Sequence, residues 1–249
     1  MQTMCEVPLG FHNLITHAVD VIRNDLGLTP TVCELGNQTL KNAKQRRTIY
    51  KRLGLKGVEP ASVREWYLSM GFSGYTAIDV NEERDAVAMD LNLNLQQAYN
   101  YTNEFDLVTN NGTGEHVFNQ LTLFENTHNL TRPGGCMIHC LPCYRWVDHG
   151  FYNYNPNLFT ALATANNYRV SHLWLAQNNM AELVELDPSV LYRQTEMRRD
   201  THIDTWERDV TVVAISWKSP DFDPNFRMPI QELYGSDNID SGEIQDRYA

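Results

Sequence analysis

Acidic and small residues stand at the ends of three short apolar segments of this sequence. Each segment has the length and composition of a buried strand, and the end residues are Glu34 with Gly36, Asp79, and Asp90. A glycine lets a ligand approach the backbone, and a carboxylate can accept two hydrogen bonds from the hydroxyls of a ribose. Any single acidic residue could equally be a helix cap, but the order of all three predicts a nucleoside site at one edge of a sheet.

Two histidines offer a different chemistry. His116 closes a polar segment, residues 110–116, which holds two glycines and follows a strand-like segment. His149 lies in residues 144–156, an aromatic and polar segment that follows the next strand-like one. Loops held by a rigid scaffold often carry function, and an imidazole there can take a proton from an acceptor. We therefore predict His116 and His149 as catalytic bases, and residues 144–156 as the wall of an acceptor pocket.

Both interpretations have structural alternatives. Thr113, Glu115 and His116 could cap and start the helix that follows them. The aromatic side chains of residues 144–156 could pack that loop without binding anything. His139 lies inside an apolar segment, so we expect it to be a core imidazole and not a base. The alternatives differ in where these side chains point.

The elements that position these residues alternate between strand-like and helix-like segments. Strands are predicted at residues 31–35, 75–80, 86–90, 105–109, 136–141, 168–176 and 210–217. Helices are predicted at residues 9–26, 37–53, 61–70, 117–130 and 156–166. The connection between the second and third strands is too short to hold a crossover helix. The alternation predicts an α/β fold in which helices cover both faces of a mostly parallel sheet.

Four segments form a more specific series. They are Val32-Cys33-Glu34-Leu35-Gly36-Asn37, Ala77-Ile78-Asp79-Val80-Asn81, Phe105-Asp106-Leu107-Val108-Thr109-Asn110 and Arg132-Pro133-Gly134-Gly135. Together they resemble successive motifs of the class I S-adenosylmethionine-dependent methyltransferases. The resemblance implies a Rossmann-like sheet with an antiparallel edge hairpin. It also implies a methyltransferase-like domain at residues 31–234, between an N-terminal helical extension (1–30) and a flexible acidic tail (235–249).

The resemblance assigns S-adenosylmethionine to the strand ends described above. The residues it implies for the cofactor are Glu34 and Gly36 by the methionine moiety, Asn37 in the first loop, Asp79 at the ribose, Asp90 and Leu91 at the adenine, and Asn110 facing the methyl group. The sequence departs from the family where Gly36 is followed by Asn37-Gln38-Thr39, because the family's first loop is rich in glycine. The family's helix between the second and third strands is also missing.

The resulting prediction is an enzyme that transfers a methyl group to a small-molecule or sugar acceptor. Oxygen is the expected acceptor atom because candidate bases are present. One alternative is a non-catalytic, methyltransferase-like partner module whose altered first loop no longer binds cofactor. Another is an enzyme that uses the same cofactor for a different reaction, since a fold does not fix a function.

Composition narrows the expected partners. The formal net charge of -11 repels phosphate backbones and anionic membranes, so we expect neither nucleic acid nor membrane as a partner and favour a small-molecule substrate. The five cysteines are an odd number, and no secretory signal is visible, which predicts reduced thiols in the cytoplasm. The histidines and carboxylates do not fall at a recognised ligand spacing, so no metal site is predicted. The oligomeric state is not predicted.

Overall fold

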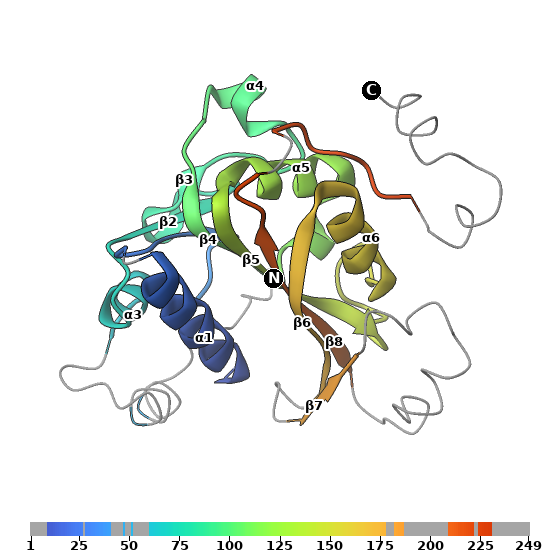
Figure 1. Ribbon diagram of the computed structural model, residues 1–249, viewed down its shortest axis with the longest axis horizontal. Coiled ribbons are helices and arrows are strands. Elements are labelled where there is room, and N and C mark those ends of the chain that lie inside the picture. The colour runs from blue at the N-terminus through green and yellow to red at the C-terminus, as the bar shows by residue number, and fades with distance from the viewer. Residues whose placement is uncertain are drawn as a thin grey trace.

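The structure is a computed structural model that describes residues 9–26, 28–40, 47, 51, 60–177, 182–186, 209–221 and 224–230. Its centre is an eight-stranded sheet (Figure 1). The strands are β1 (Thr31–Leu35), β2 (Gly74–Asp79), β3 (Val87–Ala88), β4 (Phe105–Asn111), β5 (Thr131–Tyr144), β6 (Tyr168–Gln177), β7 (Glu182–Glu185) and β8 (Val210–Lys218). These short segments form strands because they are rich in β-branched and apolar residues.

The strand order is β3-β2-β1-β4-β5-β8-β6-β7. The first five strands of the chain pair in parallel, whereas β8 runs antiparallel to both β5 and β6. The last pair, β6 with β7, is an antiparallel hairpin at the edge. The prediction of a Rossmann-like, mostly parallel sheet with an antiparallel edge hairpin is therefore confirmed.

Helices cover both faces of this sheet (Figure 1). On one face, α1 (Leu9–Leu26) and α3 (Val63–Ser69) share a hydrophobic cluster with β1, β4, β5 and β8. On the other face, α4 (Leu95–Tyr99), α5 (Gln120–Leu130) and α6 (Asn157–Asn166) pack in two further clusters. The side chains of each strand alternate between these clusters, as the pleat of a strand requires. The α1 helix thus contributes to the same core as the sheet.

The connection from β2 to β3 holds a single 3-10 turn, η1 (Glu83–Asp85), among the described residues. The two strands still pair in parallel, with Ile78 opposite Val87 and Asp79 opposite Ala88. The predicted absence of a crossover helix here is confirmed. As a result, Asp79 and the residues after β3 lie close together at one edge of the sheet.

Other segments differ from the sequence prediction. The helix expected from residue 117 begins at Gln120, and a strand, β7, lies between the strands predicted at residues 168–176 and 210–217, where none was predicted. The helix expected from residue 37 is not helical at 37–40; Arg47 and Lys51 are helical, and the rest of it lies outside the described residues. The predicted acidic tail lies outside them as well. In the described part of the chain, no helix has the length and apolarity needed to cross a membrane.

Candidate functional site

The carboxyl ends of β1, β2 and β4 lie level with one another. Leu35 of β1 is opposite Ile78 of β2 on one side and Asn110 of β4 on the other. One edge of the sheet therefore gathers the first loop after β1, Asp79 at the end of β2, and the polar loop after β4. We call this edge the rim. Ligands of open α/β sheets bind outside this edge.

Glu34 lies inside the core below this edge. Its side chain is fully buried and accepts hydrogen bonds from the hydroxyls of Tyr67 on α3 (3.2 Å) and Tyr75 on β2 (2.7 Å), and from the backbone of Gln38. Burial raises the pKa of Glu34 to about 8, although these hydrogen bonds act in the opposite direction. Glu34 thus ties the first loop to α3 and β2.

Gly36 adopts a left-handed backbone, with φ of 82°. A Cβ atom at this position would lie 2.1 Å from Oγ1 of Thr113, which itself donates a hydrogen bond to the carbonyl of Leu35 (2.8 Å). The glycine is needed because the loop after β4 packs directly on the first loop. The side chain of Gln38 strengthens this contact by donating to the carbonyl of Asn111 (2.7 Å).

The two rim carboxylates, Asp79 and Asp90, are half-buried. Asp79 accepts the backbone amide of Asn37 through Oδ2 (2.8 Å) and two bonds from Asn81 through Oδ1. Asp90 accepts two bonds from Asn92 through Oδ1, both at 2.8 Å. A carboxylate offers about four lone-pair sites, so each of them can accept further hydrogen bonds from a ligand.

The side chain of Arg84 links the loop after β2 to the first loop. It donates through Nε to Oδ1 of Asn37 and through Nη2 to the carbonyl of Asn37, both at 3.1 Å. The side-chain amide of Asn37 in turn donates to the carbonyl of Glu83. The first loop is therefore tied to the loop after β2 by side-chain contacts as well as by Asp79.

Besides Glu34, two more of the predicted cofactor residues have core environments. The side chain of Leu91 is buried in a cluster with Met89 and Leu95. The side chain of Asn110 is also buried; it lies 3.3 Å from Nδ1 of His139 and accepts the amide of Gly114 at 2.9 Å. Both residues support the loops of the rim by contacts within the protein.

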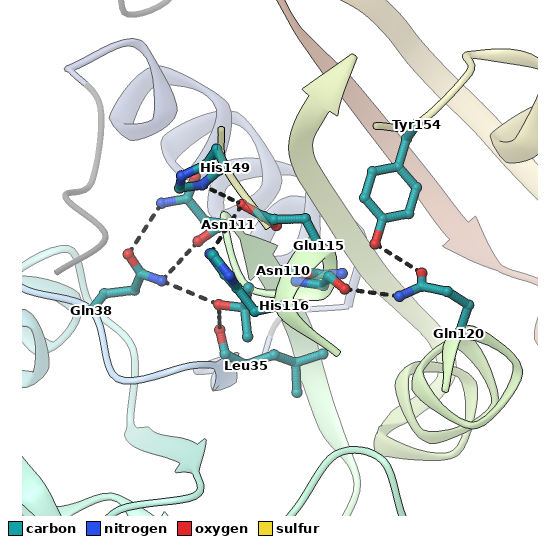
Figure 2. A network of polar contacts seen from close by, with 11 residues as sticks. Leu35, Gln38, Asn110, Asn111, Glu115, His116, Gln120, His149 and Tyr154 are labelled. Atoms are coloured by element: carbon teal, nitrogen blue, oxygen red, sulfur yellow. Dashed lines mark hydrogen bonds and ion pairs between the residues drawn. The ribbon is translucent and has the colours of Figure 1, made fainter. Parts of the chain in front are cut away.

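The loops after β4 and β5 bring Glu115, His116 and His149 together (Figure 2). Nε2 of His149 lies 3.1 Å and Nε2 of His116 lies 3.8 Å from the same carboxylate oxygen, Oε1 of Glu115. The two imidazole rings meet edge to face, with centroids 4.8 Å apart. The two predicted bases thus share one carboxylate, although 33 residues separate them in the sequence.

Glu115 is the buried member of this cluster. Its side chain is fully buried, whereas His149 is 23% and His116 is 47% exposed. Burial raises the pKa of Glu115, and the neighbouring His149 acts to lower it. Burial lowers the pKa of His116, and the proximity of His149 lowers it further. A neutral His116 is therefore favoured at physiological pH, which is the form that can accept a proton.

The capping alternative for residues 113–116 is wrong in the structure. Thr113 makes no side-chain cap hydrogen bond to the 3-10 turn η2 (Gly114–His116) that it precedes. The following helix, α5, begins at Gln120 and is capped by Asn119, whose side chain accepts the amide of Thr122. Glu115 and His116 are therefore not needed to start α5.

Two exposed aromatic residues each follow one of the histidines by two positions in the sequence. Phe118 is 71% and Phe151 is 67% exposed, and their rings meet edge to face at 5.9 Å. The hydroxyl of Tyr152 donates to the carbonyl of Phe118 (2.9 Å), which joins the loops after β4 and β5. Exposed apolar side chains that cluster in this way are typical of binding surfaces.

His139 has the core environment that the sequence predicts. It is buried, and burial lowers its pKa to about 4. The roles of Tyr67, Tyr75 and Arg84 were not predicted, because their contacts join segments that are far apart in the chain. Glu115 was considered as a cap and was not named among the predicted catalytic residues, although its position immediately before His116 was an available signal.

No protein-family model and no curated protein sequence matches the chain. Among solved structures, the plantazolicin methyltransferase BamL, in complex with a triazolic desmethylPZN analog and S-adenosylhomocysteine, is 10% identical over 83% of this chain and 84% of its own, with a TM-score of 0.47. The N-methyltransferase NodS from Bradyrhizobium japonicum, with S-adenosylhomocysteine, is 12% identical over 84% and 87%, with a TM-score of 0.44.

A third structure, the 1,6-didemethyltoxoflavin-N1-methyltransferase of Burkholderia thailandensis, is 15% identical over 82% of this chain and 77% of its own, with a TM-score of 0.37. At these identities the similarity concerns the fold alone. The fold is established by the strand order itself, in which strands β1 to β5 pair in parallel and strands β6, β7 and β8 pair antiparallel. The chain has the Rossmann-like fold that the methyltransferase resemblance implies.

Proposed function

We propose that this protein is an S-adenosylmethionine-dependent methyltransferase that acts on a small-molecule or sugar acceptor, at an oxygen atom. The rim has two halves, one formed by the loops after β1 and β2 and the other by the loops after β4 and β5. The observation that carries the proposal is the direct contact between these two halves. The loop that bears Glu115 and His116 packs on the first loop through Thr113 and Gly36. A donor held at the first loop and an acceptor held at the histidines are then neighbours.

The nucleoside half of the cofactor suits the rim carboxylates. Asp79 and Asp90 retain acceptor capacity for hydroxyl and amine hydrogens, and Asp79 is held in place by Asn37 and Asn81. Glu34, Leu91 and Asn110 act indirectly, because their side chains are buried in contacts with the protein. They hold the loops that form the rim.

When bound, S-adenosylmethionine supplies a methyl group that is already activated on a sulfonium. The protein's part is to align the acceptor oxygen with that carbon and to remove the acceptor's proton. Oε1 of Glu115 lies within hydrogen-bond distance of Nε2 of His149, which leaves Nδ1 of that ring to take the proton. The cofactor would supply the methyl group and its sulfur leaving group, while the loops that carry Glu115 and His149 would hold the acceptor oxygen and take its proton.

Phe118 and Phe151 supply an apolar wall for the acceptor. Their rings are exposed next to the histidine pair, so an organic acceptor that covers them gains from the burial of apolar surface. Aromatic walls with a few polar groups are typical of small-molecule sites.

A non-catalytic module is the second candidate function. It is favoured by the packing of Thr113 over Gly36 and by the clamp that Arg84 and Asp79 place on Asn37. These contacts occupy the loop that is rich in glycine in the family. In this case the rim binds a protein or another ligand and catalyses no reaction.

Calorimetric titration with S-adenosylmethionine and S-adenosylhomocysteine separates the two functions. The methyltransferase proposal expects both to bind, and expects His149→Ala to lower turnover while sparing this binding. Glu185→Ala, a change on the exposed edge strand β7, is the matched control. If neither compound binds the wild-type protein, the methyltransferase proposal fails and the module remains.

A further inference from the structure

One oxygen of the buried Glu115 carboxylate lacks a partner. Oε1 faces the two histidines, whereas Oε2 is buried and has no hydrogen-bond partner among the described residues. Leaving a buried polar atom unpaired is costly, and the cost is greater for a charged group. A ligand that binds this carboxylate would complete its bonding.

The neighbours of this carboxylate are metal ligands by type. Glu115, His116 and His149 each offer one ligand atom, and these atoms all lie within 4.8 Å of one another. Atoms bound to a common zinc-sized ion are about 3 to 3.5 Å apart, because each bond is about 2.1 Å long. Two of the separations, 3.1 and 3.8 Å, are already close to this range. The largest separation in the set is no more than 4.8 Å, and His116, which is half-exposed, is the member with most room to shift.

The backbone around the cluster is built for this close approach. Gly150 has a φ of 65°, and a Cβ atom there would lie 2.7 Å from Cγ and 2.9 Å from the carbonyl oxygen of Glu115. The amide of Phe151 donates to that same carbonyl at 2.6 Å. The loop that carries His149 is thus fixed against Glu115 by backbone contact. On the other side, the side chain of Gln120 holds the carbonyl of Gly114 at 2.9 Å.

We propose that Glu115, His116 and His149 bind a divalent first-row transition-metal ion, with zinc as the reference case. Two imidazoles and one carboxylate form a known ligand set for such ions, and three protein ligands leave positions for water or substrate. The exposed side of His116 is where these open positions face solvent. Cations that prefer only oxygen ligands, such as magnesium, suit this set less well.

The role of the ion in methyl transfer rests on the proposed function. The acceptor hydroxyl binds at an open position of the ion, which lowers the hydroxyl's pKa and fixes its oxygen next to the first loop. With the ion bound, the two imidazoles serve as ligands, which replaces the base role given to His149 above, and the proton passes to solvent. The buried Glu115 then balances part of the charge of the ion.

Metal binding is tested without cofactor or acceptor. The full chain is stripped with a chelator and titrated with Zn²⁺ by calorimetry, and with Co²⁺ by visible absorption. We expect equimolar binding, and a Co²⁺ spectrum that indicates nitrogen ligands and low coordination number. Glu115→Gln and His116→Ala are each expected to weaken binding by about a hundredfold or more, because losing even an outer hydrogen-bond partner of a ligand costs about 10- to 100-fold.

His172→Ala is the matched control, since His172 lies on β6 and belongs to no part of the cluster. It should bind metal as the wild type does. Because His116 is half-exposed, its replacement leaves the core intact, and circular dichroism checks that the variants fold. Equal affinity in the wild type and in both cluster variants, or no binding by the wild type, overturns the metal site.

The outcome is separable from that of the proposed function. Titration of the metal-free protein with S-adenosylhomocysteine reports on the cofactor rim alone. Binding of metal without binding of S-adenosylhomocysteine leaves the metal site standing and defeats methyl transfer. Binding of S-adenosylhomocysteine without binding of metal defeats the metal site and leaves methyl transfer standing. The histidines then act as bases, as described above.

Discussion

The two halves of the rim differ in how completely their polar groups are paired. After β1 and β2, both oxygens of Glu34 and of Asp79 accept hydrogen bonds from the protein, and Asn37 is held by several partners. After β4 and β5, Oε2 of Glu115 is buried without a hydrogen-bond partner among the described residues, and the ring of His116 is half-exposed. The first half is held in place by contacts within the protein, although Asp79 can accept further hydrogen bonds, whereas the second half keeps a buried oxygen unpaired.

This difference shows what sequence motifs report. A motif such as Glu34-Leu35-Gly36 identifies the place of a loop, but its carboxylate can act wholly within the protein. An unpaired buried atom identifies where bonding is incomplete, and it can belong to a residue with no motif, as Glu115 does. The predictions below change one half of the rim and use the other as a reference.

The largest expected effect concerns the pH dependence that Glu34 gives to stability. Its folded pKa is about 8, above the usual 4.5 of a glutamate, so the fold favours the protonated form. The stabilisation is complete below pH 4.5 and is lost as the pH rises through 8. The free energy of unfolding falls by about 1.4 kcal/mol for each pH unit in this window. The total loss is on the order of 5 kcal/mol at most. Glu34→Gln cannot titrate, so it should lose this dependence.

Urea unfolding of wild type and Glu34→Gln at a series of pH values measures the difference. We expect the free energy of unfolding of the wild type to fall relative to the variant between pH 4.5 and 8, and to run parallel to it above that range. Parallel curves throughout the range would show that Glu34 stays ionised in the folded protein, and the rise of its pKa by burial would be wrong.

The second effect concerns the contact that joins the two halves. Gly36→Ala places a Cβ atom 2.1 Å from Oγ1 of Thr113 and strains a φ of 82°. We expect it to lower the free energy of unfolding by about 3 kcal/mol. Gly134→Ala is the control, since Gly134 has a φ of 75° and no atom within 4 Å of its Cβ. The control carries the backbone strain alone, about 1 kcal/mol.

Chemical denaturation of both glycine variants separates the clash from the strain. If Gly36→Ala and Gly134→Ala lose equal stability, the loops after β1 and β4 do not press on each other. The neighbouring positions of donor and acceptor would then lack their structural basis.

A third, smaller effect distinguishes the ligands of the two halves. Asp79→Asn keeps the size of the side chain but removes the charge that accepts the hydrogens of Asn37 and Asn81. We expect the affinity for S-adenosylhomocysteine to fall by about ten- to thirtyfold, as for loss of a hydrogen bond to a charged group. His149→Ala should leave this affinity unchanged. Calorimetry on both variants gives the answer, and an unaffected Asp79→Asn removes Asp79 from the site.

The fold was largely predictable because its signals are local. Short runs such as Val32-Cys33-Glu34-Leu35 and the helical repeats of residues 9–26 depend on neighbouring residues alone. The start of α5 was missed because Gly114–His116 forms a 3-10 turn before Asn119 caps the helix. A strand at β7 was missed because its pairing with β6 is a tertiary contact.

The candidate site was predictable in position but only partly in role. Rim residues were identified from the strand ends that precede them, and the two histidines from the polar loops. The burial of Glu34 depends on Tyr67 and Tyr75, which lie 33 and 41 residues away, and no spacing rule reports such a contact. The convergence of His149 on Glu115 likewise needs the folded sheet, because it joins two different loops.

The smallest expected effect tests the aromatic wall on the acceptor side. Phe151→Ala removes an exposed ring, so it should change stability by less than about 0.5 kcal/mol. If an acceptor packs on this ring, losing the contact weakens its binding by about 1 kcal/mol, or fivefold in KM. Leu183→Ala removes an exposed apolar side chain from β7 and is the control. Steady-state kinetics with a working acceptor should show the KM change for Phe151 alone, with the affinity for S-adenosylhomocysteine unchanged; equal KM values for both variants place the acceptor elsewhere on the rim.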